Sequence, residues 1–310
     1  MKDKFSIAIH GGAGTLTRGL MSEEMEQNYK KDLLRALRCG ASLLEKGASS
    51  MDAVEAAVRE LEDSPLFNAG KGSVFTHEGK HEMDACIMEG NSRKAGAVAG
   101  VSGIRNPVSL ARLVMEKSDH VLLSSKGALQ FARQQGVSIE EDEYFYNELR
   151  YLQWQQALKE GTVQLDHTPL NEKKFGTVGA VALDIHGNLA AATSTGGMTN
   201  KRFGRIGDSP IPGAGNYANN ATCAVSCTGS GEYFIRGVVA YDVSCLIEYK
   251  GLTLKQACHE VIQNRVMALG GDGGLIAVSP SGELCLEFNT EGMYRASRDI
   301  DGLERVGIYR

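Results

Sequence analysis

Two threonines of this chain, Thr177 and Thr195, stand at the open ends of two apolar segments that a tight turn can join. A turn centred on His186 or Gly187 pairs the segments as a hairpin and sets Thr177 opposite Thr195, or one place away. A threonine hydroxyl is a weak nucleophile without a neighbouring base, and no Gly-x-Ser-x-Gly motif or evident histidine partner stands near this pair in the sequence. Cleavage between Gly176 and Thr177 would create such a base, because a free α-amine has a pKa of about 7.7 to 8.0.

Gly176 is compatible with this cleavage, since a residue without a Cβ atom tolerates the strained backbone that hydroxyl attack on the preceding carbonyl requires. A simpler interpretation is that Thr177 merely begins a strand, and the residue types alone favour it. The wider sequence has to decide between the two interpretations.

Composition excludes several functional classes. The 310 residues are 42% hydrophobic and 23% charged, as is usual for a globular protein that can bury a sizeable core. The net charge of −5 and the dispersed Lys and Arg residues argue against nucleic-acid binding. The apolar run from Phe5 to Ile9 is too short for a signal peptide or a membrane span, so we expect a cytoplasmic protein without membrane contacts. Seven cysteines without a framework spacing fit reduced core thiols and argue against a zinc site.

The hydrophobic pattern predicts a mixed α/β protein. Strands are expected at residues 5–9, 94–101, 177–184, 189–195, 275–278 and 284–288, and helices at residues 22–47, 50–64, 107–114, 128–135, 232–248 and 253–268. Ser50 is the expected N-cap of the second helix and Asn106 that of the third, with Pro107 in the first helical position. From about residue 138 to 175 the chain becomes polar and aperiodic, which is typical of a linker; its last part is residues 155–176.

Motifs spread over almost the whole chain resemble those of the plant-type asparaginase and isoaspartyl-peptidase family of N-terminal-nucleophile hydrolases. Several resemble most closely the bacterial isoaspartyl aminopeptidases with asparaginase activity. The motifs are Ile9-His-Gly-Gly-Ala-Gly, Pro65-Leu-Phe-Asn-Ala-Gly-Lys-Gly, Met83-Asp-Ala-Cys, Gly176-Thr-Val-Gly-Ala-Val-Ala-Leu-Asp, Thr193-Ser-Thr-Gly-Gly, Arg205-Ile-Gly-Asp-Ser-Pro, Cys227-Thr-Gly-Ser-Gly-Glu and Asn289-Thr-Glu-Gly-Met-Tyr-Arg.

The resemblance implies self-cleavage between Gly176 and Thr177, with Thr177 as the nucleophile and its freed amine as the base. Thr195 would orient the nucleophile. The implied reaction is hydrolysis of L-asparagine and of isoaspartyl (β-aspartyl) dipeptides to release L-aspartate, without a catalytic cofactor.

The resemblance also assigns the groups that stabilise charge. Thr228 and the backbone N–H of Gly229 would form the oxyanion hole, with Asn68 close by, and these donors would face the charge that develops on the attacked carbonyl. Gly231, in the same motif as Thr228, is expected to line the substrate site.

Arg205 and Asp208 would hold the free aspartyl headgroup of the substrate. By resemblance, the planar fork of Arg205 binds the α-carboxylate and Asp208 binds the α-ammonium. Spacing alone favours an ordinary surface ion pair between them, and only the surrounding motif points to a clamp. The sequence Lys201-Arg202-Phe203-Gly204 before Arg205 departs from the family pattern and adds bulk and charge near the pocket, which affects the size of the leaving group.

The loop from Leu61 to Lys71 resembles the structural sodium loop of the family, in which backbone carbonyls bind the ion. The carbonyl oxygens expected as ligands belong to Leu61, Glu62, Phe67 and Ala69, and oxygen ligands suit a hard cation. The other glycine-rich segment, His10-Gly-Gly-Ala-Gly, lacks the G-x-G-x-x-G spacing of a dinucleotide-binding loop. By resemblance this segment lies beside the nucleophile, and His10 is a structural hydrogen-bonding residue rather than a base.

The implied fold is a four-layer αββα sandwich that forms a single domain over residues 1–310. Cleavage would divide it into an α subunit of residues 1–176 and a β subunit of residues 177–310, and two such pairs would form a dimer.

Three alternatives remain open. A glycosylasparaginase shares the fold and the nucleophile, but commonly carries Asp where this chain has Gly176 and is secreted or lysosomal. A threonine aspartase that cuts proteins is disfavoured, because no long insertion precedes Thr177. An uncleaved, non-catalytic protein of the same fold that binds aspartyl ligands is the alternative from another functional class.

Overall fold

A large antiparallel sheet crosses the middle of the molecule. The structure is a computed structural model that describes residues 4–19, 21–163 and 176–310. The strands of this sheet are β1 (Ser6–Gly14), β2 (Met83–Glu89), β3 (Ala95–Val101), β4 (Leu122–Ser124), β5 (Val178–Leu183), β6 (Leu189–Thr195), β11 (Gly292–Arg298) and β12 (Glu304–Tyr309). Their order is β12-β11-β1-β5-β6-β2-β3-β4, and only β3 and β4 pair in parallel.

A second, smaller sheet stacks on one face of the large sheet. Its strands are β7 (Asn216–Asn219), β8 (Cys223–Gly229), β9 (Gly273–Val278) and β10 (Leu284–Phe288). They are antiparallel, in the order β10-β9-β8-β7.

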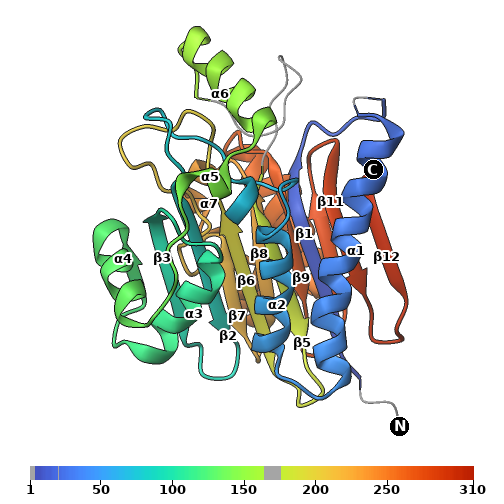
Figure 1. The fold of residues 1–310 in the computed structure, drawn as a ribbon. Coiled ribbons are helices and arrows are strands. Elements are labelled where there is room, and N and C mark those ends of the chain that lie inside the picture. The colour runs from blue at the N-terminus through green and yellow to red at the C-terminus, as the bar shows by residue number, and fades with distance from the viewer. Residues whose placement is uncertain (1–3, 20, 164–175) are drawn as a thin grey trace.

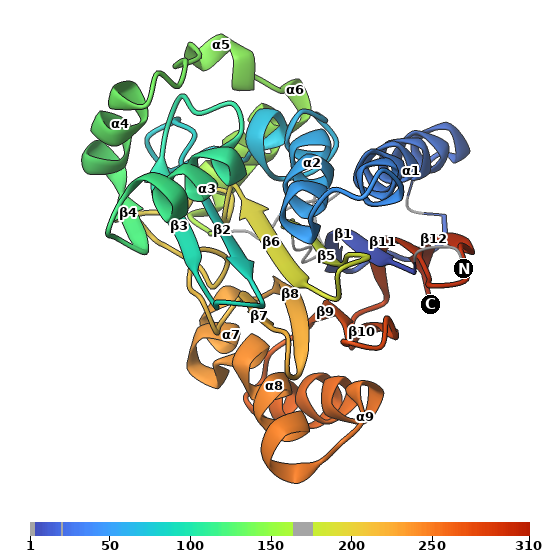
Figure 2. The same ribbon diagram turned by 90° about the horizontal axis from the view of Figure 1, so that it is seen from below.

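Helices cover the two outer faces. The first group comprises α1 (Glu23–Glu45), α2 (Ser50–Glu62), α3 (Pro107–Lys117), α4 (Ser125–Gln134), α5 (Asp142–Phe145) and α6 (Glu148–Glu160), with a 3-10 turn at Gly70–Gly72. The second comprises α7 (Gly231–Gly237), α8 (Val239–Lys250) and α9 (Leu254–His259), which continues as a π-helical segment over Glu260–Val266. Helices α1 to α3 lie on the large sheet and α8 and α9 on the small one (Figures 1 and 2). The predicted four-layer αββα sandwich is confirmed.

The strands in the middle of the sandwich are buried on both faces. Along β5, Ala180 and Ala182 pack toward α1 and α2, whereas Val181 and Leu183 pack toward the small sheet. Such a strand is apolar throughout, which explains the unbroken run that the sequence shows here. Within the described residues, no helix is both long enough and apolar enough to cross a membrane. All seven cysteines are free thiols.

Most expected elements are present, with local corrections at their ends. The N-cap of α2 is Ser49, whose hydroxyl accepts from Asp52 N at 3.2 Å, and not Ser50. Asn106 and Pro107 begin α3 as predicted, although the Asn106 side chain makes no capping hydrogen bond. The expected helix over 232–248 is broken at Val238, where φ is +47° and α7 gives way to α8.

The prediction of a linker over residues 138–175 was wrong in its first part. Helices α5 and α6 form there, and Figure 1 shows α6 at the edge of the fold, above the sheets. Arg150 of α6 is 1% exposed and donates to the carbonyls of Gly72 (3.1 Å) and Leu66 (3.3 Å). Trp154 of the same helix stacks on Phe75, so tertiary contacts hold a helix whose surface lacks a clear apolar period. Residues 164–175 of the predicted linker lie outside the described part of the chain.

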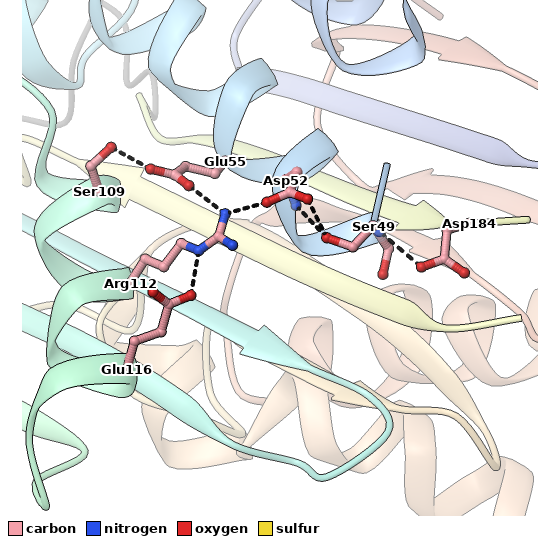
Figure 3. A network of polar contacts seen from close by, with 8 residues as sticks. Ser49, Asp52, Glu55, Ser109, Arg112, Glu116 and Asp184 are labelled. Atoms are coloured by element: carbon pink, nitrogen blue, oxygen red, sulfur yellow. Dashed lines mark hydrogen bonds and ion pairs between the residues drawn. The ribbon is translucent and has the colours of Figure 1, made fainter. Parts of the chain in front are cut away.

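An ion-pair network joins α2 and α3 on the outer face of the large sheet. Arg112 of α3 contacts Asp52 and Glu55 of α2 at 2.7 Å each, and Glu116 of its own helix at 2.7 Å (Figure 3). The three carboxylates that surround the Arg112 guanidinium raise its pKa, although burial opposes the shift. The Arg112 side chain is 23% exposed, so solvent screens these contacts less than those of an exposed pair.

We expect Arg112→Ala to lower the free energy of unfolding by about 1 to 3 kcal/mol, because it leaves a half-buried Glu55 without its charged partner. Arg38→Ala removes an arginine that is 63% exposed and paired with Glu304, and should cost less than about 1 kcal/mol. Urea denaturation of both variants measures the difference. Equal losses would contradict the role assigned to this network.

Candidate active site

The hairpin of β5 and β6 brings the two predicted threonines together. Val178 pairs with Ser194, and the same register sets Thr177 opposite Thr195. The Thr177 hydroxyl donates to Thr195 Oγ1 at 3.2 Å, and both residues are buried. The pairing expected from the turn is confirmed.

The carbonyl of Gly176, immediately before Thr177, accepts two side-chain hydrogen bonds. Thr195 Oγ1 donates to it at 2.9 Å and Asn68 Nδ2 at 3.0 Å. Asn68 is fixed in turn, because its Oδ1 accepts from Val74 N at 3.1 Å. Two donors on one carbonyl polarise it and favour negative charge on its oxygen. The site thus polarises the backbone carbonyl that precedes the Thr177 hydroxyl.

The predicted oxyanion donors stand at the end of β8. Thr228 is completely buried, and its hydroxyl has no hydrogen-bond partner among the described residues. A buried hydroxyl without a partner is costly, and this arrangement is typical of a site that receives an oxygen from a ligand. Gly229 is the last residue of β8. A Cβ atom there would lie 2.5 Å from Phe234 Cε2 and 2.6 Å from the Asp272 carbonyl oxygen, so only glycine fits at this position.

Arg205 and Asp208 converge on Gly231. A Cβ atom added at Gly231 would lie 2.9 Å from Asp208 Oδ1 and 3.0 Å from Arg205 Nη2. Asp208 is 4% exposed, and its Oδ2 has no partner among the described residues. Glycine at position 231 therefore leaves a gap between one cationic and one acidic group.

Glu232 is a site residue to which sequence reasoning gave no role. Its carboxylate accepts from Arg205 Nε and Nη2 at 2.9 Å each. This fork-to-fork contact fixes the plane of the guanidinium and leaves its remaining N–H groups free to bind another anion. The ion pair of Arg205 is thus with Glu232, and the sequence signal was available, since Glu232 ends the motif that begins at Cys227.

Burial raises the pKa of Asp208 to about 7, although the nearby Arg205 lowers it. The carboxyl group therefore changes its charge near neutral pH while the chain carries no ligand. A bound ammonium group would favour the ionised form, because an opposite charge at contact distance lowers a carboxyl pKa.

One pocket connects these groups. It is open to solvent and leaves about 10 Å³ for the centre of a water molecule, roughly room for one water. Its walls are formed by Gly176, Thr177, Thr195, Gly197, Met198, Arg205, Gly207, Asp208, Ser209 and Gly229. Of the other predicted site residues, Asn68 lies behind Gly176, Gly231 lies against the clamp, and Thr228 lies next to Gly229.

The loop after α2 carries the four carbonyls that the resemblance assigns to a sodium ion. Leu61 and Glu62 end the helix, where carbonyls carry partial negative charge, and the carbonyls of Leu61, Phe67 and Ala69 each accept a backbone hydrogen bond. Cβ atoms added at Gly70 and Gly72 would lie 2.4 Å from the Glu62 oxygen and 2.1 Å from the Phe67 oxygen. The loop therefore packs its glycines against the carbonyls of Glu62 and Phe67, two of the four predicted ligands Leu61, Glu62, Phe67 and Ala69.

Comparison with known proteins identifies the family of the chain. A family model described as asparaginase matches residues 3–308. The chain belongs to this asparaginase family. It is 56% identical to an isoaspartyl peptidase of Escherichia coli over 99% of this chain and 97% of that protein. It is 46% identical to a putative isoaspartyl peptidase/L-asparaginase of Dictyostelium discoideum (97% and 95% covered) and 42% identical to an isoaspartyl peptidase/L-asparaginase of Homo sapiens (97% and 95% covered).

The raised pKa of Asp208 makes a prediction about stability. Below pH 7 the native carboxyl holds a proton that the unfolded chain loses above about pH 4, so the free energy of unfolding should fall as pH rises through this window. Asp208→Asn removes this dependence. Relative to its parent, the variant should gain up to about 1 kcal/mol per pH unit between pH 4 and 7 and nothing further above that.

Urea unfolding from pH 4 to 8, with Thr177→Ala in both proteins so that each remains one chain, measures the gain. Parallel curves for variant and parent would show that Asp208 is already ionised in the native state at low pH.

Proposed function

We propose that this chain is an autoprocessing threonine amidohydrolase that hydrolyses L-asparagine and isoaspartyl (β-aspartyl) dipeptides to release L-aspartate. The observation that carries the proposal is the Gly176 carbonyl, which two side chains polarise beside the Thr177 hydroxyl. The names of the relatives supply the substrate class, and the gap between Arg205 and Asp208 has the charges that a free aspartyl headgroup requires.

In the self-cleavage that we propose, Thr177 Oγ1 attacks the Gly176 carbonyl carbon. Negative charge on the carbonyl oxygen is stabilised by Asn68 and Thr195. The peptide C–N bond breaks as an ester forms with the Thr177 hydroxyl oxygen, and the proton of the hydroxyl passes to the departing amine. Water then hydrolyses the ester, which leaves a carboxylate on Gly176 and a free amine and hydroxyl on Thr177. Since Gly176 forms part of the pocket wall, this step also makes room for a substrate.

Turnover would use the same hydroxyl with the new amine as its base. Thr177 Oγ1 attacks the side-chain amide carbonyl of the substrate and its proton goes to the amine. The oxyanion is stabilised by the Thr228 hydroxyl and the Gly229 N–H. The amine then protonates the leaving ammonia or amino acid, and water hydrolyses the aspartyl ester to release aspartate.

Selectivity would come from the clamp. Arg205, held by Glu232, offers its free N–H groups to the α-carboxylate, while ionised Asp208 accepts from the α-ammonium. A ligand without the α-ammonium leaves Asp208 without a cationic partner, and one without the α-carboxylate leaves the free N–H groups of Arg205 unused, so both should bind more weakly. We further propose that the protein acts in the cytoplasm as a dimer of α–β heterodimers, a state that light scattering would measure.

We expect Thr177→Ala to abolish both self-cleavage and turnover, because it removes the hydroxyl that attacks the carbonyl carbon, and the neighbouring Thr195 hydroxyl serves as a donor to the oxygen of Gly176. Intact-mass spectrometry under denaturing conditions, after incubation at neutral pH, measures cleavage, and aspartate release measures turnover. Thr177→Ser keeps a hydroxyl and should still be cut. A wild-type chain that stays intact, binds aspartate and releases no product would favour the non-catalytic alternative.

Asn68→Ala tests the activation of the Gly176 carbonyl in the same assay. Losing one donor to a developing oxyanion should slow cleavage by about 10²- to 10³-fold. Asn91→Ala changes an exposed asparagine and serves as the matched control. Equal cleavage rates for these two variants would contradict the role of Asn68.

We also propose that the carbonyls of Leu61, Glu62, Phe67 and Ala69 hold a structural sodium ion. The ion would stiffen the loop that carries Asn68, and a ligand bound only by the native state stabilises it. The midpoint of thermal unfolding should therefore be lower in choline chloride than in sodium chloride at equal ionic strength. Identical midpoints over a wide range of sodium concentrations would contradict the site.

A further inference from the structure

A chain of four buried polar side chains runs beneath Thr177, from the large sheet into the small one. His10 Nδ1 lies 3.0 Å from the Thr177 carbonyl oxygen, and His10 Nε2 lies 2.9 Å from Ser226 Oγ. Ser226 Oγ is 2.7 Å from Thr193 Oγ1, which accepts from Asn216 Nδ2 at 3.0 Å. All four side chains have no exposed surface.

The Thr177 carbonyl and the His10 ring fix the directions of the first two hydrogen bonds in this series of side chains. The Thr177 carbonyl can only accept, so His10 donates from Nδ1. Burial lowers the pKa of His10 to about 3, so the ring is neutral and its Nε2 accepts from the Ser226 hydroxyl. The Ser226 oxygen then accepts from Thr193, although the Gly215 carbonyl at 3.2 Å competes for that proton. The Asn216 amide nitrogen, which can only donate, closes the series.

The surroundings set this hydrogen-bonded chain apart, because most of the described side chains near it between the two sheets are apolar. Ala8, Val181, Ala191, Ala224 and Ile276 pack there. A buried polar group in such a place must keep its partner or pay a desolvation penalty, so the chain fixes the relative position of the strands that carry it.

Gly179 shows that the sequence makes room for this chain. A Cβ atom at Gly179 would lie 2.0 Å from Ser226 Oγ and 2.4 Å from His10 Nε2. Its φ is not in the left-handed region, so the backbone does not require glycine here. The contacts with Ser226 and His10, together with the Ala192 carbonyl at 3.0 Å, exclude a side chain from a strand that is otherwise built of valine, alanine and leucine.

This series of hydrogen-bonded side chains matters most once the bond before Thr177 is cut. The nitrogen of Thr177 is then no longer bonded to Gly176. Rotation about the Thr177 Cα–C bond would change how the amine and the hydroxyl face the pocket. His10 opposes this rotation by holding the carbonyl. Ser226, two residues before Thr228 on β8, ties the same carbonyl to the strand that carries the oxyanion donors.

We propose that His10, Ser226 and Thr193 are positioning residues that hold the Thr177 nucleophile and the Thr228–Gly229 oxyanion donors in one frame. The inference rests on the proposed function, because it assigns these residues to the catalytic step of that reaction. None of the three touches the pocket, so each would act through Thr177 or through β8.

Ser226→Ala and Ser244→Ala test the proposal as a matched pair. Ser244 is also fully buried and contacts a second hydroxyl, that of Thr222, at 2.7 Å, but this contact joins α8 to the loop before β8. Both variants should lose stability by similar amounts. Only Ser226→Ala should lower kcat for L-asparagine, by about 10- to 100-fold, with KM within about twofold of the wild type.

The assay uses full-length protein that has cleaved itself, with kcat expressed per new Thr177 N-terminus, so that slow cleavage is not mistaken for slow turnover. The pH profile of kcat/KM should shift in Ser226→Ala, because the amine no longer keeps its position beside the hydroxyl. Thr193→Val and Thr193→Ser give a second pair, in which the serine restores the hydroxyl and should restore most of kcat.

An unchanged kcat in Ser226→Ala and Thr193→Val would overturn the proposal, as would an equal loss of kcat in Ser244→Ala. If Ser226→Ala does not fold, the Thr193 pair decides. A wild-type protein that neither cleaves itself nor releases aspartate would refute the proposed function instead, so the two failures can be told apart.

Discussion

The site depends on one constraint, which is that the backbone on both sides of the bond between Gly176 and Thr177 is held still. On one side, Asn68 and Thr195 hold the Gly176 carbonyl; on the other, His10 holds the Thr177 carbonyl. These three residues come from a loop, a neighbouring strand and the first strand of the chain. Their convergence requires the central order β1-β5-β6 and the packing of α2, whose C-terminus leads into the loop of Asn68.

Electrostatics in the pocket follow from the same burial. Asp208 is kept from water, and its pKa rises until a ligand with positive charge can restore the ionised form. The Glu232 carboxylate, whose side chain is 53% exposed, forms an ion pair with Arg205 and compensates the charge of the guanidinium without a ligand. In the function that we propose, the pocket would prefer a ligand with both charges over one with either alone.

Much of this arrangement could be predicted from the sequence. The Thr177–Thr195 pairing follows from two apolar segments joined by a tight turn, because the turn sets the register of a hairpin. The four-layer fold and the clamp came from the resemblance, since periodicity alone indicates only a mixed α/β protein. The nucleophile was likewise ambiguous on residue type, and the family motifs decided it.

What the sequence did not show depends on contacts between distant segments. The sequence predicts a linker in place of helix α6, because the helix packs through Arg150 and Trp154 against a loop some eighty residues earlier. His10 is more than 160 residues away in the sequence from its partners Thr177 and Ser226. The residue types serine and histidine do not by themselves indicate such distant hydrogen bonds. Gly179 was the one visible trace, a glycine inside an apolar strand that had no turn to explain it.

The strand order has a consequence for the life of the mature protein. β1 lies between β11 and β5, so a strand from before the cleavage point is flanked on both sides by strands from after it. The intact chain can assemble this sheet as a single molecule, but two separate chains would have to meet before they could do so, and their refolding would depend on concentration. Self-cleavage would therefore be a one-way step in folding as well as in chemistry, and the rate of unfolding, more than an equilibrium with the unfolded state, would set how long the cleaved protein lasts.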